Sequence, residues 1–209
     1  MIAGPVAAIL AGYLLGSIPF AYIAGRLFRK VDIRRVGGGN VGATNVMREV
    51  GTAPGIGVFA LDVAKGAAAV LVAQALGVSQ IVVFLAGFAA VVGHSWSVFL
   101  KFSGGKGGAT TIGVFWGLAP LASAIVFGIM LLGAFVTSNL RLSMAAGFIC
   151  LPFILWGFGA DLALIVYSIA LPLFTGLRAL PSLIKSARNP EERKNFLIDK
   201  DHKPWQEKK

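Results

Sequence analysis

The chain has 209 residues, of which 56% are hydrophobic and 13% are charged, and its mean hydropathy is +0.79. This composition supplies too little polar surface for a soluble globule, so an integral membrane protein is predicted. The formal net charge of +10 favours anionic lipid headgroups and phosphorylated substrates as partners rather than nucleic acid, although part of it is expected only to set the topology.

Six apolar windows follow one another along the chain, and most reach the roughly 20 residues that a membrane-crossing helix needs. They cover residues 2–28, 55–76, 81–100, 112–137, 142–159 and 162–177. The first window lacks a charged leader and carries Pro19 and Arg26 toward its end, so it is interpreted as a span of the mature protein rather than a cleaved signal. Gly117 and Pro120 interrupt the fourth window, and residues 106–137 are long enough for two short helices that meet near Pro120.

The positions of Lys and Arg favour seven transmembrane helices over six. Six such residues lie from Arg26 to Arg48, so this loop is predicted to face the cytoplasm and the uncharged N-terminus to lie outside. Six spans would place the basic C-terminal tail outside, whereas seven spans place every basic loop and the tail in the cytoplasm. We therefore predict an all-α, polytopic membrane protein with about seven transmembrane helices. Residues 1–185 form a single transmembrane domain, and residues 186–209 form a basic cytoplasmic tail.

The first of two glycine-rich segments is VGGGNVGATNVMR, residues 36–48. Glycines lack the Cβ atoms that would stop backbone N–H groups from converging on one anion, and amide and hydroxyl side chains add neutral donors. The predicted phosphate-binding residues are Gly37, Gly38, Gly39, Asn40, Gly42, Thr44 and Asn45, with Arg48 as a fixed cation. The alternative is a flexible, solvated loop with a helix N-cap at Thr44 or Asn45.

The second segment is KFSGGKGGATT, residues 101–111. It is not a Walker loop, because Gly107 and not Ser or Thr follows Lys106, so NTP hydrolysis is disfavoured. A helix that begins near Thr110 would present free N–H groups and its positive dipole end to a phosphate, with Lys106 as the counter-charge. The predicted phosphate-binding residues here are Lys101, Gly104 and Gly105. The two segments together predict two phosphate sites at the inner membrane surface, where a donor and an acceptor react mainly through positioning and charge stabilisation.

Three ionisable residues lie inside apolar windows. Asp62 and Lys65 share one helix face, where either they neutralise each other or Lys65 helps to shape a pocket for an anionic substrate near the cytoplasmic end. His94 precedes the second glycine segment and is either a satisfied interfacial histidine or a catalytic one. Ser17 is expected to hydrogen-bond back to a carbonyl of its own helix.

The sequence lacks the residues that a metal site or a serine nucleophile would need. The second histidine, His202, lies in the polar tail, and Cys150 is single, so neither a histidine cluster nor a cysteine metal site is available. A GxSxG nucleophile motif is absent from the sequence. No metal and no cofactor are therefore expected.

Three stretches resemble the first two signature blocks of the bacterial acyl-phosphate:glycerol-3-phosphate acyltransferases. They read GSIPFAYIAGR from residue 16, DIRRVGGGNVGATNVMR from residue 32 and GHSWSVFLKFSGGKGGAT from residue 93. The resemblance implies a seven-helix enzyme of the bacterial inner membrane whose active site faces the cytoplasm. Such an enzyme transfers a fatty acyl group from acyl phosphate to the 1-hydroxyl of glycerol 3-phosphate, which gives lysophosphatidate and inorganic phosphate in phospholipid synthesis.

By this resemblance the loop at residues 37–45 holds a phosphate, and Arg48 and Lys106 face substrate phosphate charges. Ser143, in a cytoplasmic turn, matches a polar serine of the family, and together with His94 it completes the candidate catalytic set of Lys106, Arg48, His94 and Ser143. Membrane lipids are the further expected partners.

The chain also departs from the family pattern. Gly38 stands where the family usually has Ser, and Ser97 stands where it has Pro. The family's third pattern, RHxxN, aligned on Arg178, falls on Ala179 and Ser182, so its histidine and asparagine are lost. This loss predicts an enzyme that is slow, altered in substrate or inactive, unless other residues replace the two side chains.

A second function class stays open at this point: a non-catalytic binder or transporter of a phosphorylated metabolite or lipid. A transporter is expected to show pseudo-symmetric halves with broken helices at the middle of the membrane. The sequence shows no evident internal repeat, and this favours the enzyme. We expect the acceptor hydroxyl to attack directly, without a protein nucleophile.

Overall fold

The computed structural model describes residues 2–188, except for the side chains of residues 185–187. All regular elements of this range are helices, as predicted. The chain forms two compact units, one up to Leu118 and one from Ala119 onward. Helix α6 (Gly108–Leu118) ends at this boundary and α7 (Pro120–Thr137) begins after Ala119. Proline has no N–H to continue a helix and is favoured at the first helical position, so the predicted break near Pro120 is confirmed.

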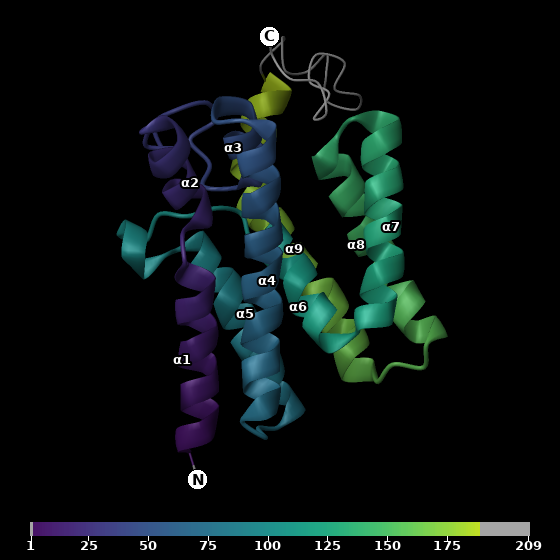
Figure 1. Ribbon diagram of the computed structural model, residues 1–209. Helices are drawn as coiled ribbons and strands as arrows, with labels where there is room; N and C mark the ends of the chain where they lie inside the picture. Colours follow the sequence, from purple (N-terminus) through teal and green to yellow (C-terminus); the bar gives the residue numbers. More distant parts are fainter. Residues whose placement is uncertain (1, 189–209) are drawn as a thin grey trace. The chain divides into compact units, whose positions relative to one another are not determined.

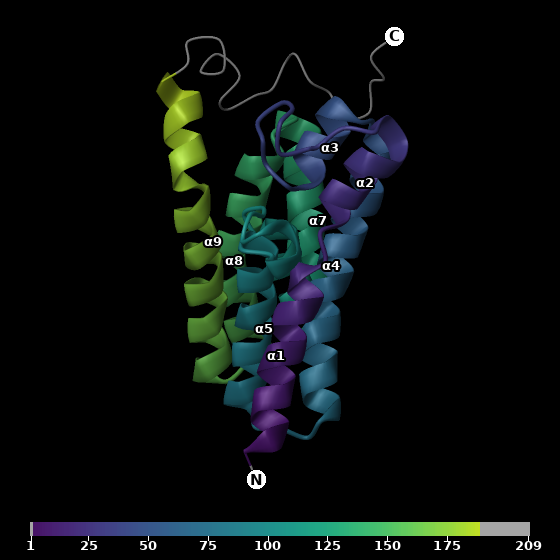
Figure 2. The ribbon, with the colours of Figure 1, turned by 90° about the vertical axis from the view of Figure 1, so that its left-hand side faces the viewer.

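The first unit is built around three helices that lie side by side (Figures 1 and 2). They are α1 (Ala3–Ser17), α4 (Thr52–Ala75) and α5 (Gln80–Ser95). The short helices α2 (Phe20–Arg29) and α3 (Ala43–Glu49) lie at the end of this unit opposite the N-terminus (Figure 1). A 3-10 helix, η1 (Val98–Leu100), connects α5 to α6. The first glycine-rich segment thus covers part of the α2–α3 connection and most of α3, and the second covers the η1–α6 connection and the start of α6.

Glycines allow the helices of the first unit to pack with their backbones in contact. A Cβ at Gly16 of α1 would collide with the backbone carbonyl of Ala90 in α5, and one at Gly66 of α4 would collide with that of Thr110 in α6. Small residues at helix contacts are the usual means of close packing in a membrane, where the lipid is as apolar as the side chains. These contacts fix α5 and α6 against α1 and α4, and they determine where the second glycine segment lies.

The first apolar window contains two helices instead of one. Ile18 takes an extended conformation (φ −57°, ψ 117°) after α1, as residues before proline tend to, and α2 starts at Phe20. Five helical stretches of the described residues are long and apolar enough to cross a membrane, at 3–29, 52–75, 120–137, 140–157 and 162–184. The shorter apolar helices α5 and α6 accompany them. An all-helical integral membrane protein is confirmed, while the seven-span count and the sides of the termini stay predictions.

The second unit contains α7, α8 (Leu140–Gly157) and α9 (Leu162–Arg188). Helix α9 includes Pro172 and Pro181 and continues well beyond residue 177, where the last window was expected to end. The predicted boundary between residues 185 and 186 therefore falls inside a helix, and residues 189–209 lie outside the described range. A single domain over residues 1–185 stays a prediction.

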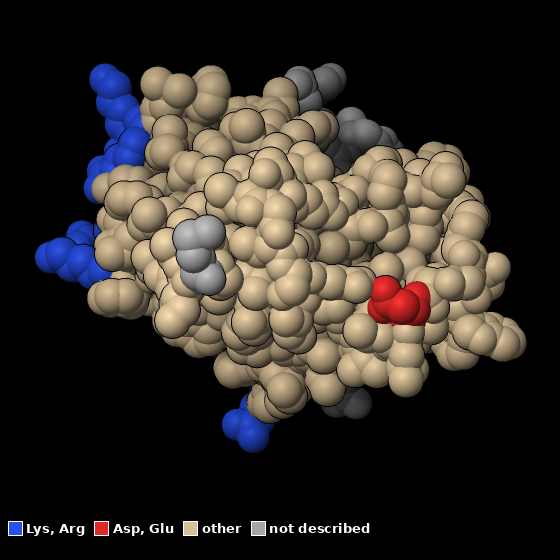
Figure 3. Space-filling view, turned by 90° about the horizontal axis from the view of Figure 1, so that it is seen from below, with Lys and Arg blue, Asp and Glu red and all other residues tan. Residues whose placement is uncertain are grey.

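The charges of the first unit are distributed unevenly along its helices. Figure 3 looks onto the end where α1 begins, and Lys and Arg side chains are visible only at the margin of that view. The turn between α4 and α5, residues 76–79, contains no charged residue, whereas five Lys and Arg residues lie between Arg26 and Arg35 at the opposite end. This asymmetry agrees with the one-sided charge on which the predicted topology rests.

Candidate functional site

The first glycine segment is closed by the buried side chain of Asn45. Its Oδ1 accepts a hydrogen bond from the Gly38 N–H at 3.1 Å, and its Nδ2 donates to the carbonyls of Ile33 at 3.0 Å and Val36 at 3.1 Å. Both amide hydrogens of Asn45 are thus engaged by the loop itself. Asn45 therefore shapes the loop in this conformation, and a contact between Asn45 and a substrate phosphate stays a prediction.

The glycines of this segment have different conformations. Gly37 and Gly39 are left-handed, with φ of +56° and +66°, and a Cβ at Gly37 would press against Asn45 and Glu49. Gly38 is exposed, and a Cβ there would meet nothing within 4 Å, so packing leaves room for the serine that the family usually has. Gly42 is extended (φ −163°) and is the N-cap residue of α3, so the predicted N-cap at Thr44 or Asn45 is corrected to Gly42.

The remaining polar residues of the first segment lie around the start and end of α3. Asn40 is half-buried, and its Nδ2 lies 2.9 Å from where a Cβ of Gly42 would be. Thr44 is half-buried in the first turn of α3, and Arg48 is exposed in its last turn. None of these three residues lines the small cavity that lies beside the second glycine segment.

An ion pair holds the chain just before this segment. Asp32 accepts hydrogen bonds from Arg34 Nε at 2.9 Å and Nη2 at 2.7 Å, and Arg26 Nη2 lies 3.7 Å away. The hydrogen bond from Arg34 is the main reason that the pKa of Asp32 lies well below its usual range, and Asp32 in turn raises the pKa of Arg34. Asp32 is therefore ionised at neutral pH.

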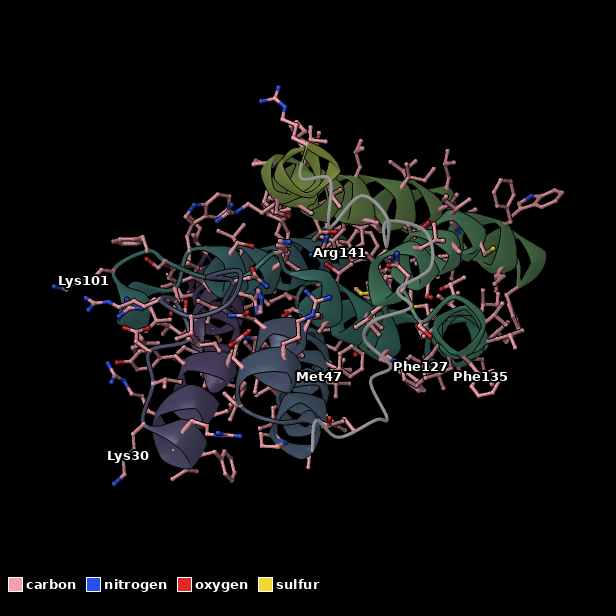
Figure 4. All side chains as sticks on the ribbon, turned by 90° about the horizontal axis from the view of Figure 1, so that it is seen from above. Lys30, Met47, Lys101, Phe127, Phe135 and Arg141 are labelled. Carbon is pink, nitrogen blue, oxygen red and sulfur yellow. The ribbon has the colours of Figure 1, made fainter. Side chains whose placement is uncertain are left out.

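The second glycine segment divides into an outward and an inward part. Lys101 is left-handed (φ +54°), and it projects outward at the edge of the first unit, as Lys30 does (Figure 4). Lys101 is exposed whereas Gly105 is buried, and a phosphate contact by Lys101 stays a prediction. Lys106 is half-buried in the connection to α6, which begins at Gly108, slightly before the predicted start near Thr110.

The two glycine segments meet at Gly105. The Gly105 N–H donates to the His94 carbonyl at 3.0 Å. A Cβ at Gly105 would collide with His94 Nε2 and lie 2.5 Å from the carbonyl oxygen of Val41, a residue of the first segment. Gly104 is held equally closely against the carbonyls of His94 and Ser95. Only glycine fits at this junction, which brings the predicted residues Gly104, Gly105 and His94 together.

A small cavity opens beside this junction. Its lining includes Val41 and Gly104 from the two segments and the charged residues Asp62 and Lys65 from α4. Lys65 Nζ lies 2.8 Å from Asp62 Oδ1, and both side chains are only 3% exposed. Asp62 and Lys65 therefore form an ion pair and also line the cavity, while an anionic substrate beside Lys65 stays a prediction.

Ser17 lines the same cavity in a way that differs from the prediction. Its buried Oγ has no partner among the described residues, so the expected bond to its own helix is not formed. Its backbone carbonyl accepts a hydrogen bond from Ser97 Oγ at 2.5 Å. Sequence reasoning identified Ser97 only as a departure from the family pattern and missed this contact, because no local signal links positions 17 and 97.

Comparisons with known proteins show the family of this chain. The sequence model described as Glycerol-3-phosphate acyltransferase matches residues 6–185. The chain belongs to this family. Glycerol-3-phosphate acyltransferase 1 of Dehalococcoides mccartyi is 37% identical over 203 residues, which is 94% of this chain and 97% of that relative. Glycerol-3-phosphate acyltransferase 2 of Moorella thermoacetica is 54% identical over 115 residues, so the match spans 55% of this chain and 59% of that relative.

Solved structures show the same family fold. The crystal structure of PlsY (YgiH), an integral membrane glycerol 3-phosphate acyltransferase, superposes in its glycerol 3-phosphate form with a TM-score of 0.79. The sequences are 32% identical, and the superposition covers 87% of this chain and 90% of that one. The lysophosphatidic acid form of PlsY gives a TM-score of 0.77. Family membership decides between the two function classes in favour of the acyltransferase.

The other residues that the family resemblance suggested lie in the second unit. Ser143 is buried in the first turn of α8, where its Oγ donates to the Asn139 carbonyl at 2.8 Å. Ser182 Oγ donates to the Ala179 carbonyl at 2.9 Å within α9. A catalytic role for Ser143 stays a prediction. Among residues 2–188 no group of three or more His, Cys, Asp or Glu side chains is arranged to hold a metal ion.

Proposed function

We propose that this protein transfers a fatty acyl group from acyl phosphate to the 1-hydroxyl of glycerol 3-phosphate, and so forms lysophosphatidate and inorganic phosphate for phospholipid synthesis. Family membership supports the reaction class, and the two PlsY structures, named for their glycerol 3-phosphate and lysophosphatidic acid forms, support the acceptor and the product. The observation that carries the proposal is the junction at Gly105, where the two segments that are predicted to hold phosphates meet.

The proposed reaction needs no protein nucleophile. The acceptor hydroxyl oxygen forms a bond to the acyl carbonyl carbon, and the bond between that carbon and the phosphate oxygen breaks. The phosphate leaves with the bonding electrons, and the hydroxyl proton passes to a phosphate oxygen. Catalysis then consists of holding two phosphorylated molecules in contact and stabilising the charge that develops on the carbonyl and the leaving group.

We assign the phosphate contacts to the backbone N–H groups of both glycine segments and to nearby cations. Lys106 precedes the N-terminus of α6, where the helix dipole also favours an anion. Arg48, at the end of α3, supplies a second cation at the first segment. We further propose that the active site faces the cytoplasm, that the protein lies in a bacterial inner membrane with its N-terminus outside, and that seven helices cross it.

A direct test uses the purified protein in lipid with acyl phosphate and glycerol 3-phosphate, and measures lysophosphatidate by mass spectrometry. Acyl-CoA in place of acyl phosphate should give no product. Lys106→Met removes the charge but keeps the side-chain length, and we expect it to slow the reaction by about 100-fold, as the loss of one charge-stabilising donor does. Lys30→Met is the matched control, because Lys30 projects outward (Figure 4). Absence of product from the folded wild-type protein would overturn the proposal.

A further inference from the structure

A helix break inside the first unit is stabilised by side chains from distant elements. Where α1 ends, the carbonyls of Ser17 and Ile18 lack the partners that a continuous helix would supply, and lipid offers none. Ser97 Oγ donates to the Ser17 carbonyl at 2.5 Å. The Ile18 carbonyl accepts a hydrogen bond from Lys65 Nζ at 2.9 Å and a second one from the Phe20 N–H at 3.2 Å. A cation from α4 therefore satisfies a backbone carbonyl at the break between α1 and α2.

That cation belongs to a larger buried group. Asp62 Oδ1 lies 2.8 Å from Lys65 Nζ and 3.5 Å from His94 Nδ1. Asp62, Lys65 and His94 are only 2%, 5% and 8% exposed. Ionisable side chains inside an apolar helix bundle are costly and are retained where they do a specific task. Asp62 alone is enough to neutralise Lys65, so the contact between Asp62 and His94 needs a separate explanation.

The imidazole ring of His94 supplies that explanation through its other edge. While Nδ1 faces Asp62, Nε2 lies so close to Gly105 that a Cβ on this glycine would collide with it. Gly105 in turn lies against the carbonyl of Val41 in the first glycine segment. The rigid ring thus fills the space between the charged face of α4 and the junction of the two segments, and the position of Asp62 determines where the ring lies.

We propose that Asp62, Lys65 and His94 form a positioning group that holds the second glycine segment against the first. The proposal rests on the proposed function, since the juxtaposed segments are the ones assigned to the donor and acceptor phosphates. None of the three residues is a catalytic residue on this account. They act through Gly105, and a loop that leaves this position binds its phosphate in a smaller fraction of the molecules, which raises the KM in proportion.

Substitutions of His94 test the two edges of the ring separately. His94→Asn keeps a donor near the Nδ1 position but loses the edge at Gly105, and His94→Gln reaches toward Gly105. We expect His94→Ala and His94→Asn to raise the KM for at least one phosphorylated substrate about tenfold or more, with a smaller change in kcat, and His94→Gln to restore part of the loss. Ser95→Ala is the matched control, because the neighbouring Ser95 Oγ is buried without a partner among the described residues.

A second readout does not depend on activity. Amide hydrogen exchange of a peptide that covers residues 103–108 should be about tenfold faster in His94→Ala than in the wild type, and unchanged in Ser95→Ala. A lower kcat at unchanged KM, with unchanged exchange, would overturn positioning and indicate that His94 acts on the reacting atoms. Unchanged kinetics and unchanged exchange would overturn it as well. Absence of wild-type activity with the expected exchange pattern would refute the proposed reaction and leave the positioning group supported.

Discussion

Replacement of Asn45 by alanine should open the first glycine segment before any substrate binds. The substitution removes three hydrogen bonds, which Asn45 makes with the Gly38 N–H and with the carbonyls of Ile33 and Val36. Each is worth about 1 kcal/mol net, so the closed loop loses about 3 kcal/mol relative to open forms. Since 1.4 kcal/mol is a factor of about ten, the opening equilibrium shifts by roughly 100-fold.

The assay is amide hydrogen exchange of residues 36–42 in the substrate-free protein, combined with the KM values for both substrates. We expect exchange in Asn45→Ala to be faster by up to about 100-fold, and KM for the phosphate held by this loop to rise because only the closed fraction binds. Asn45→Asp keeps the oxygen that accepts from Gly38, but it turns a second, charged oxygen toward the carbonyls of Ile33 and Val36, so it should destabilise the closed loop at least as much as Asn45→Ala. If Asn45→Ala changes KM but leaves exchange of the free loop unchanged, Asn45 contacts the substrate and our reasoning is refuted.

Three further predictions concern packing, pH and metals. Gly16→Ala should lower the melting temperature, because the new Cβ collides with the Ala90 backbone. Gly57→Ala in α4 should leave it unchanged, because a Cβ there meets nothing within 4 Å, and thermal unfolding in detergent measures both variants. Arg34 lowers the pKa of Asp32, so the stabilisation of the loop by ionised Asp32 is fully present above pH about 4 and is lost as the pH falls toward the folded pKa. Arg34→Met should raise the pKa of Asp32 toward its usual value in an NMR titration, and an unchanged value would contradict the assignment. Activity should survive EDTA, and a loss that Mg²⁺ restores would show that a metal takes part.

The sequence predicted features that depend on local chemistry. Hydropathy reports the average surroundings of a helix, and it identified the apolar windows and the membrane class. Pro120 breaks a helix by the loss of one donor, so this break was also predictable. The glycine segments were found because glycines let backbone N–H groups converge on an anion, whereas at Gly105 the missing Cβ makes room for His94 and the Val41 carbonyl.

Features that depend on contacts between distant residues were not predictable in this way. The hydrogen bonds that Asn45 makes within the loop were not predicted, because nothing in a single sequence reveals that both amide hydrogens are engaged by Ile33 and Val36. The break at Ile18 was missed, although Pro19 was noted, because its stability depends on donors from α4 and from residue 97. Helix α9 includes Pro172 and Pro181 and exceeds its predicted length, since prolines are tolerated inside membrane helices where other groups satisfy the freed backbone.

The central claim is that the protein catalyses acyl transfer from acyl phosphate to glycerol 3-phosphate by positioning the two molecules. The most direct measurement follows phosphate release and lysophosphatidate formation over time by the purified protein in lipid, with and without glycerol 3-phosphate. The account predicts equal amounts of both products, and neither of them without the acceptor. Phosphate release without the acceptor, or an acyl group left covalently on the protein, would contradict direct transfer between two bound substrates.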